Sequence, residues 1–312
     1  MIENEFKEKL EKEVTAEKEL VKPVKYRSVK ASKRVSTIIS YILLVILTII
    51  WLYPILWILL HSFRSEYTDG NFVGYIVGYY FPRGFGFENY IKLFTETLFL
   101  RWFFNTLLVS VFTFILSTML TLSVAYVMSK IKFKARKKFL SIAIILGLFP
   151  GFMSMIAIYY ILKSVQLTQS LFALILVYSA GSGLGFYVAK GFFDIIPNSL
   201  MESARLDGAT NAQIFSKIVL PLSKPIIIYT ALLSFIGPWM DFIFAKVILG
   251  QKEELWTVSI GLYDMVYGGQ VSPNNFTVFA AGSVIVAIPI VTLFLSMQKY
   301  YVEGVTAGAV KG

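Results

Sequence analysis

Residues 102–138 read WFFNTLLVSVFTFILSTMLTLSVAYVMSKIKFKARKK. The part from Trp102 to Ser129 carries no charged side chain and exceeds the roughly 20 residues that a helix needs to cross the hydrocarbon core of a bilayer. The part that follows is rich in lysine and arginine, and short basic loops of this kind stay on the cytoplasmic side of a membrane. This stretch therefore predicts a membrane-spanning helix and indicates which of its ends faces the cytoplasm.

The composition of the whole chain is that of a membrane protein. Of its 312 residues, 56% are hydrophobic and only 15% are charged, and the mean hydropathy is +0.68. Cysteine is absent, which excludes disulfides, thiolate metal sites and a cysteine nucleophile. His61 is the only histidine; we expect it to be an interfacial side chain, and a metal site is not expected. The net charge of +10 does not predict nucleic-acid binding, because the basic residues flank the apolar stretches.

Six stretches of the chain are predicted to span the membrane, so the expected fold is an all-α integral membrane protein. The fifth stretch is interrupted at Gly237-Pro238, where we expect a break, and Pro289 predicts a kink in the sixth. The predicted spans are Thr37–Leu60, Trp102–Ser129, Phe139–Leu162, Ser164–Ala189, about Pro225 to about Leu249, and Phe276–Gln298.

The charges between the spans predict the orientation. Residues 22–34 and 130–138 carry basic side chains and no acidic ones, so both segments are expected in the cytoplasm. The segment 61–101 is balanced and the loop around residues 252–264 is net acidic, so both are expected outside. Both termini are then cytoplasmic: a tail of residues 1–36, a membrane domain of residues 37–300 and a tail of residues 301–312. The first 20 residues are expected to be a solvated helix or a disordered tail, with a partner-binding amphipathic helix as the alternative.

A polar segment, residues 191–224, lies between the fourth and fifth predicted spans and falls in the cytoplasm in this topology. We expect it to form two short helices, with Gly208 permitting the turn between them and Pro221 limiting the second. Two patterns predict capping boxes at the helix starts, and these are Ser199-x-x-Glu202 and Thr210-x-x-Gln213. Glu202 is therefore a candidate for a local cap as well as for a contact with a partner, and the two roles are compatible.

This polar segment resembles the signature of permease subunits of ATP-binding-cassette (ABC) importers, EAA-x3-G-x9-I-x-LP. The resemblance covers residues 37 to 312 and points to the carbohydrate-uptake branch, the maltose/maltodextrin type. The sequence departs from the family at Ser203, where alanine is usual, and at Met240-Asp241, where the family commonly has Asn-Glu. The matching residues are Gly191-Phe192-Phe193-Asp194-Ile195-Ile196-Pro197, Glu202-Ser203-Ala204-Arg205-Leu206-Asp207-Gly208-Ala209, Ile218-Val219-Leu220-Pro221, Asn89-Tyr90, Trp102-Phe103-x-Asn105-Thr106, Pro238-Trp239-Met240-Asp241-Phe242 and Tyr300 to Gly312.

The resemblance implies a multi-pass subunit of the bacterial cell membrane that imports maltodextrin-like oligosaccharides. It implies a second permease subunit, usually a different chain, two ATPase subunits and an extracytoplasmic sugar-binding protein as partners. The chain has no G-x4-G-K-[ST] phosphate loop, so ATP and Mg²⁺ are expected on the partner ATPases, and this chain is expected to be no enzyme and to bind no cofactor. The residues expected to couple to an ATPase subunit are Glu202, Ser203, Ala204, Asp207, Gly208, Ile218 and Pro221.

Four residues of the fifth span are candidates for the substrate pathway. Asp241 and Lys246 are ionisable at membrane depth, where such side chains are usually functional, and Trp239 and Tyr229 could offer aromatic platforms to a sugar. The alternatives are that Lys246 reaches the outer interface and that the Gly237-Pro238 break only bends the helix. The run Gly181-x-Gly183-x-Gly185 has the wrong spacing for a nucleotide fingerprint and is interpreted as a site of close helix packing or local unwinding.

Two other classes of protein compete with this interpretation. A secondary transporter would also be polytopic and basic-flanked, but it usually shows internal repeats, and the two halves of this sequence show none. A membrane enzyme would need a catalytic motif, and neither H-E-x-x-H nor a nucleophile elbow occurs. Transport that persists in membranes without an ATPase partner would favour the secondary transporter.

Overall fold

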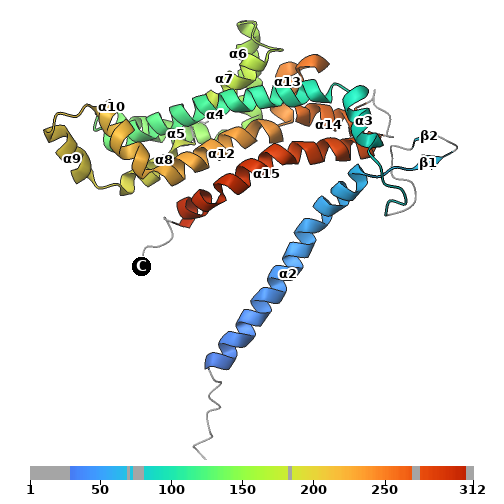
Figure 1. The fold of residues 1–312 in the computed structure, drawn as a ribbon. Coiled ribbons are helices and arrows are strands. Elements are labelled where there is room, and N and C mark those ends of the chain that lie inside the picture. The colour runs from blue at the N-terminus through green and yellow to red at the C-terminus, as the bar shows by residue number, and fades with distance from the viewer. Residues whose placement is uncertain (1–28, 69–70, 73–80, 182–184, 269–274, 307–312) are drawn as a thin grey trace, which may run out of the picture. The chain divides into compact units, whose positions relative to one another are not determined.

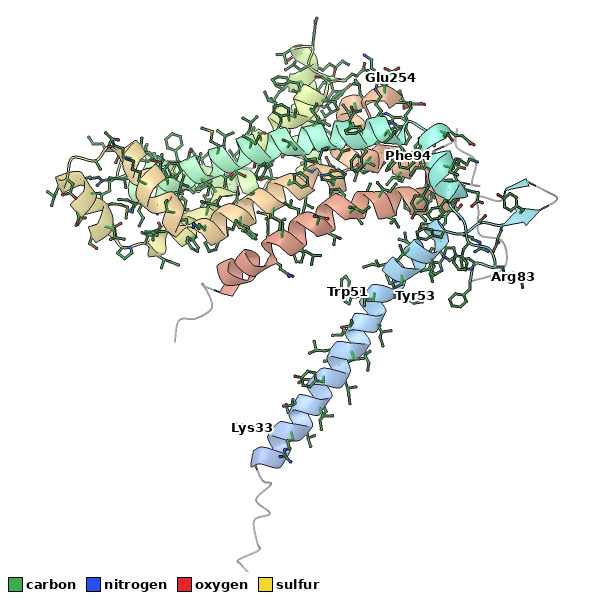
Figure 2. The ribbon with its side chains drawn as sticks, in the orientation of Figure 1. Lys33, Trp51, Tyr53, Arg83, Phe94 and Glu254 are labelled. Carbon is green, nitrogen blue, oxygen red and sulfur yellow. The ribbon has the colours of Figure 1, made fainter. Side chains whose placement is uncertain are left out.

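The computed structural model describes residues 29–68, 71–72, 81–181, 185–268 and 275–306, and these form a helical protein with one short β pair (Figure 1). The chain divides into two compact units, Met1–Leu56 and Trp57–Gly312. The first unit contains most of helix α2 (Val29–Ser62), and Figure 2 shows the exposed side chains of Trp51 and Tyr53 pointing away from its axis. The short tail of this unit, residues 1–28, lies outside the described residues, as do residues 307–312 at the other terminus.

The second unit contains all the other elements. Strands β1 (Tyr67–Thr68) and β2 (Asn71–Phe72) pair antiparallel, with Tyr67 opposite Phe72. A π-helical turn (Phe215–Val219) and a 3₁₀ turn (Glu253–Leu255) complete the list. The α-helices are α3 (Glu88–Thr95), α4 (Phe99–Lys130), α5 (Arg136–Gly147), α6 (Gly151–Ser164), α7 (Leu171–Gly181), α8 (Phe186–Ile195), α9 (Asn198–Leu206), α10 (Asn211–Ile214), α11 (Leu220–Leu222), α12 (Lys224–Met240), α13 (Ile243–Leu249), α14 (Val258–Tyr267) and α15 (Phe276–Thr306).

Among the described residues, four helical segments are long and apolar enough to cross a membrane, or up to six if each of two bent helix pairs is one span. The predicted first, second and sixth spans are confirmed as helices. They lie within Lys33–Ser62 and Phe99–Lys130 and coincide with Phe276–Gln298, respectively. The agreement arises because these stretches are long, uncharged and without an internal pair of helix breakers.

The predicted third and fourth spans are wrong in detail. The third span is broken: α5 and α6 meet at 101°, and Pro150 takes the N-cap position of α6. Proline disfavours the helical conformation in the residue before it, so the helix stops ahead of Pro150. In place of the fourth span the structure describes two helices, α7, which begins at Leu171 rather than Ser164, and α8, which ends at Ile195; residues 182–184, including Gly183, lie outside the described part.

The predicted break in the fifth span lies a few residues too early. Helix α12 continues through Gly237 and Pro238, and the backbone leaves the helix at Asp241, whose φ and ψ are −81° and 121°. A proline near the end of a helix removes one backbone hydrogen bond, and here the following turn still closes through a bond from the Asp241 N–H to the Gly237 carbonyl. A second bend of 88° lies at Ser223, between α11 and α12.

Helix α4 is the central element of the second unit. Figure 1 shows α4, α12 and α15 running along one another. Helices α9 and α10 lie at one end of this bundle, which we call the α9 end, and α3 lies at the opposite end, which we call the α3 end. Small hydroxyl side chains let neighbouring helices approach α4 closely, as is typical of helix packing in membranes. The buried ones on α4 are Thr106, Ser110, Thr113, Ser117, Thr121 and Ser129.

Two apolar clusters hold the second unit together. One lies towards the α3 end and includes Phe99, Trp102, Leu249, Ile260 and Met265. The other lies towards the α9 end and packs α4 against the polar segment; it includes Tyr126, Phe193, Met201, Ile214 and Val219. The polar segment is therefore attached to the helix bundle by buried apolar side chains.

Polar contacts fasten the connections at the α3 end, and they correct the expectation for His61. That side chain is fully buried, and its Nε2 lies 3.2 Å from Nη1 of Arg64. Asn89 Nδ2 donates to the carbonyls of Ser62 (3.0 Å) and Arg64 (2.8 Å), and Thr277 Oγ1 donates to Asn89 Oδ1 (2.7 Å). His61 is buried rather than interfacial; its Nδ1 lies 2.9 Å from the Trp57 carbonyl, and its ring lies 4.1 Å from the Trp57 ring.

Candidate functional site

The polar segment forms the predicted elbow between two short helices. Helix α9 ends at Leu206, and Gly208 has a φ of +83°, the left-handed region that glycine adopts without a steric penalty. The turn is closed by bonds from the Gly208 N–H to the Arg205 carbonyl (3.0 Å) and from the Ala209 N–H to the Ala204 carbonyl (2.9 Å). The predicted turn at Gly208 is confirmed, since this pattern of bonds is how glycine commonly terminates a helix.

Only one of the two predicted capping boxes forms. Thr210 Oγ1 accepts from the Gln213 N–H (3.3 Å), and the Thr210 N–H donates to Gln213 Oε1 (2.8 Å). The box between Ser199 and Glu202 is wrong, because Pro197 takes the N-cap position of α9 and no side chain caps that helix. The Glu202 side chain therefore does not cap α9, and it lies exposed on that helix.

The elbow presents most of the predicted coupling residues at its surface. Ala204 and Ile218 are half-buried against the second apolar cluster. Leu206 lies inside the motif but is not among the predicted coupling residues, and it is 90% exposed at the end of α9. A leucine inside a polar segment was the available signal, although single exposed apolar side chains are common on protein surfaces. The predicted residues that lie exposed are Glu202, Ser203, Asp207, Gly208 and Pro221.

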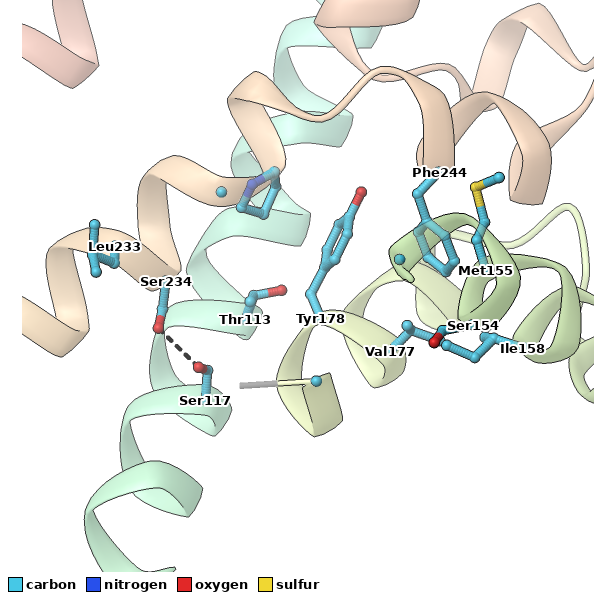
Figure 3. A pocket seen from close by; sticks show the side chains of 14 residues that line it. Thr113, Ser117, Ser154, Met155, Ile158, Val177, Tyr178, Leu233, Ser234 and Phe244 are labelled. Carbon is cyan, nitrogen blue, oxygen red and sulfur yellow. Dashed lines mark hydrogen bonds between the residues drawn. The ribbon is translucent and has the colours of Figure 1, made fainter. Parts of the chain in front are cut away.

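A cavity of about 440 Å³ lies among α4, α6, α7, α12 and α13 (Figure 3). Three glycines line it, Gly151, Gly181 and Gly237, and a Cβ added to any of them would meet nothing within 4 Å. The cavity is therefore open at these three positions, where α6, α7 and α12 each carry a glycine and no side chain fills the space.

Hydroxyl groups supply the polar part of the cavity wall. Ser117 and Ser234 share a hydrogen bond of 2.8 Å, which Figure 3 marks between α4 and α12. Thr113 is 2% exposed, and its Oγ1 has no hydrogen-bond partner in the described protein. Ser154 and the ring of Tyr178 also line the space. Buried hydroxyls are normally hydrogen-bonded, so Thr113 Oγ1, which solvent does not reach in this structure, is an unsatisfied polar atom in the cavity wall.

The predicted pathway residues do not line this cavity. Asp241 does not line the cavity but contacts two residues that do. Its Oδ2 accepts a hydrogen bond from the Tyr178 hydroxyl (2.5 Å), and its Oδ1 accepts one from the Phe244 N–H (3.2 Å). Asp241 therefore orients Tyr178 and starts helix α13. The lining glycines and hydroxyls were missed because single small residues in apolar helices carry little sequence signal, although Thr113 and Ser117 do lie one turn apart on α4.

The other three pathway candidates lie elsewhere. Lys246 Nζ is 3.7 Å from the ring centroid of Trp256, a cation–π contact. Trp239 is only 4% exposed and packs in the core, its ring 5.3 Å from that of Phe103. Tyr229 is half-buried against the cluster at the α9 end. These placements give Lys246 and Trp239 packing roles within this chain.

The described residues offer no site to a metal. No group of three or more histidine, aspartate or glutamate side chains lies together in the part of the chain that the structure describes. The polar features there are the exposed elbow and the hydroxyl-lined cavity, at different places along the same bundle.

Comparison with known proteins gives consistent matches over most of the chain. Residues 27–306 match the model of the family described as binding-protein-dependent transport system inner membrane component. The galactooligosaccharides transport system permease protein GanQ of Bacillus subtilis (strain 168) is 35% identical over 91% of this chain and 98% of its own length. The maltodextrin transport system permease protein MalD of Streptococcus pneumoniae (strain ATCC BAA-255 / R6) is 32% identical over 91% of this chain and 99% of its own length.

A solved structure matches as well. A chain of a bacterial ABC transporter involved in the import of the acidic polysaccharide alginate aligns with a TM-score of 0.75 and 25% identity. The alignment covers 90% of this chain and all of that one. The sequence matches and the fold match therefore extend over the same large part of the molecule.

Proposed function

This chain belongs to the family of binding-protein-dependent transport system inner membrane components, and from that membership we propose that the elbow couples it to an ATPase and that the cavity carries its sugar. The chain is a multi-pass protein of the bacterial plasma membrane and a permease subunit of a sugar ABC importer. The geometry of the elbow is the observation that carries the coupling role.

The elbow is suited to transmit a movement of a soluble subunit that binds to it. Its backbone turn is closed by hydrogen bonds, its far side is packed on the bundle through Met201 and Ile214, and its tip exposes Leu206. In our proposal the segment 191–224 lies in the cytoplasm, with both termini on the same side, and α9 docks on an ATPase subunit. Figure 2 supports this topology, since Phe94 and Glu254, from the two segments expected outside, lie at the α3 end, far from α9.

The energy source in this proposal is a separate protein. The sequence has no phosphate-binding loop, so ATP and Mg²⁺ would bind to two partner ATPase subunits, and this chain would hold no cofactor. The remaining proposed partners are a second permease subunit and an extracytoplasmic sugar-binding protein. The family description, which names binding-protein-dependent transport, supports the last of these.

We assign an oligosaccharide pathway to the cavity. Sugars are recognised by hydroxyl hydrogen bonds together with aromatic faces, and Thr113, Ser154 and Tyr178 offer both. A maltodextrin-like substrate agrees with the resemblance to MalD, and a galactooligosaccharide agrees with the resemblance to GanQ. Sugar-stimulated ATP hydrolysis by the reconstituted importer, measured across both classes of oligosaccharide, distinguishes the two.

Gly208→Asp tests the coupling role. The substitution adds a charge at the elbow. An added Cβ meets nothing within 4 Å there, and aspartate tolerates a positive φ better than most residues, so the subunit should still insert and assemble. We expect uptake to fall at least tenfold while ATP hydrolysis continues. Gly208→Asn is the matched control, because asparagine tolerates a positive φ and adds no charge, and it should keep at least half of the uptake.

Two results would reject parts of this proposal. Wild-type uptake by a normally assembled Gly208→Asp variant would reject coupling through the elbow. Uptake that persists without the ATPase subunits would instead favour the secondary-transporter alternative.

A further inference from the structure

The connection between α8 and α9 is a short joint that needs support. Helix α8 ends at Ile195 and α9 begins at Asn198, so only Ile196 and Pro197 connect them. Both connecting residues are extended, with ψ angles of 125° and 131°. Two residues outside a helix leave the backbone several rotatable bonds, and a force applied to α9 could be lost by rotation at this joint.

Lys130, the last residue of α4, bonds to both sides of that joint. Its Nζ donates to the carbonyl of Ile196 (2.6 Å) and to Oδ1 of Asn198 (3.2 Å). The first acceptor lies just past the end of α8, where backbone carbonyls lack a helical partner, and a lysine ammonium is well suited to such a site. The second is the side chain of the first residue of α9. One ammonium group therefore holds the two helices at a fixed spacing.

Two further contacts join the last turns of α4 to the same segment. Ser129 Oγ donates to Oδ1 of Asp194 (2.6 Å), whose Oδ2 accepts from Lys190 Nζ (2.6 Å). Tyr126 donates its hydroxyl to the carbonyl of Asn211 (3.2 Å), at the start of α10. The end of α4 thus contacts the polar segment before the joint, at the joint and after the elbow.

The same helix forms part of the cavity wall. Thr113 and Ser117 of α4 line the cavity, and Ser117 is hydrogen-bonded to Ser234 of α12. Between Thr113 and Lys130 the helix has neither proline nor glycine, and at 1.5 Å per residue this stretch is about 25 Å long. A continuous helix of this length transmits a displacement from one end to the other.

We propose that Lys130 is a positioning residue that clamps the α8–α9 joint to α4, so that movement of α9 is transmitted to the cavity wall. The proposal rests on the coupling role of the elbow proposed above. Lys130 contacts neither the substrate pathway nor the exposed tip of α9. Its effect is to keep the joint from absorbing the displacement.

The test compares the number of sugar molecules taken up per ATP hydrolysed by the complete importer in liposomes. We expect Lys130→Met to lower this ratio at least fivefold, and Lys130→Arg, which keeps a cationic donor, to stay within twofold of wild type. Lys134→Met is the matched control, because Lys134 is an exposed lysine of the same basic segment, and its ratio should equal that of wild type. A purely structural role would reduce assembled importer, and with it uptake and hydrolysis together, without changing the ratio.

Asn198→Ala provides a second route if Lys130→Met does not assemble. It removes the acceptor on α9 and keeps the positive charge of Lys130 at the end of α4. We expect it to lower the ratio of sugar taken up to ATP hydrolysed at least twofold. An unchanged ratio in assembled Lys130→Met or Asn198→Ala, or an equal fall in Lys134→Met, would overturn the clamp. If Gly208→Asp uncouples the importer and Lys130→Met does not, only the clamp fails; if neither changes the ratio, the coupling role of the elbow fails as well.

Discussion

Single residues give the two candidate sites their properties. Gly208 permits the turn of the elbow because its φ of +83° is strained for other residues, whereas Gly151, Gly181 and Gly237 leave open space in the cavity. Thr113 allows a functional role to be tested apart from a packing role, because its hydroxyl makes no hydrogen bond within the described protein. A buried hydroxyl without a partner costs about 1–3 kcal/mol, so the chain retains an unfavourable group where the proposed sugar would pass.

Thr113→Val tests whether that hydroxyl binds substrate. Valine has nearly the same shape and lacks the unpaired hydroxyl, so we expect the thermal stability of the importer to hold or rise while the KM for uptake rises several-fold. Thr118→Val is the matched control, because Thr118 lies on the same helix and also has a buried, unpaired hydroxyl but does not line the cavity. Equal KM values for the two variants would remove Thr113 from the pathway.

At the level of elements, the positions where helices break give the bundle its cavity. The break between α5 and α6 brings Gly151 and Ser154 to the cavity wall, and the break at Asp241 turns α13 so that Phe244 lines it. The carboxylate of Asp241 stabilises the second break by accepting the Phe244 N–H and the Tyr178 hydroxyl. An ionisable residue that looked like a pathway group by sequence therefore has a demonstrable structural role.

Asp241→Ala measures that structural role. It removes both bonds, and by analogy with the loss of a helix cap it should destabilise the subunit by about 1–2 kcal/mol, seen as a lower thermal midpoint of the purified importer. Asp241→Asn keeps one acceptor oxygen for the Phe244 N–H, and its amide nitrogen can donate to the Tyr178 hydroxyl, so it should lose less stability than Asp241→Ala. A loss of uptake in Asp241→Ala with unchanged stability would instead return Asp241 to the substrate pathway.

At the level of the whole molecule, contacts between distant segments hold the α3 end together. Trp102 Nε1 donates to the carbonyl of Glu253 (2.8 Å), and Asn105 Nδ2 donates to the carbonyls of Glu254 (2.9 Å) and Trp256 (3.0 Å). Two of the motif residues that suggested the family thus fasten α4 to the chain ahead of α14. Their part in the described structure is to connect elements.

Gly261→Ala tests this packing. A Cβ at Gly261, on α14, would overlap the Trp102 ring, so the substitution should displace the ring from its hydrogen bond and destabilise the subunit by about 1–3 kcal/mol. Gly147→Ala is the matched control, since its added methyl group meets nothing within 4 Å. Equal thermal midpoints for Gly261→Ala and wild type would contradict the close fit.

A good part of the site could be predicted from the sequence. Gly208 and the box at Thr210 follow local rules of backbone conformation, and both are confirmed. The box at Ser199 failed because two local signals compete there and Pro197 takes the cap position. The contacts of Lys130 could not be predicted from a local sequence pattern, because its two acceptors lie 66 and 68 residues further along the chain.

The sequence by itself determined that this is a membrane protein, where α2, α4 and α15 lie, and to which family the polar segment points. Those properties depend on the free energy of transferring each side chain from water to lipid and on short motifs. Both are local properties of consecutive residues. Only the tertiary structure decided that His61 is buried, that α12 continues to Met240 and that small residues of separate helices surround a cavity. These depend on which distant side chains meet, and hydropathy along the chain does not contain that information.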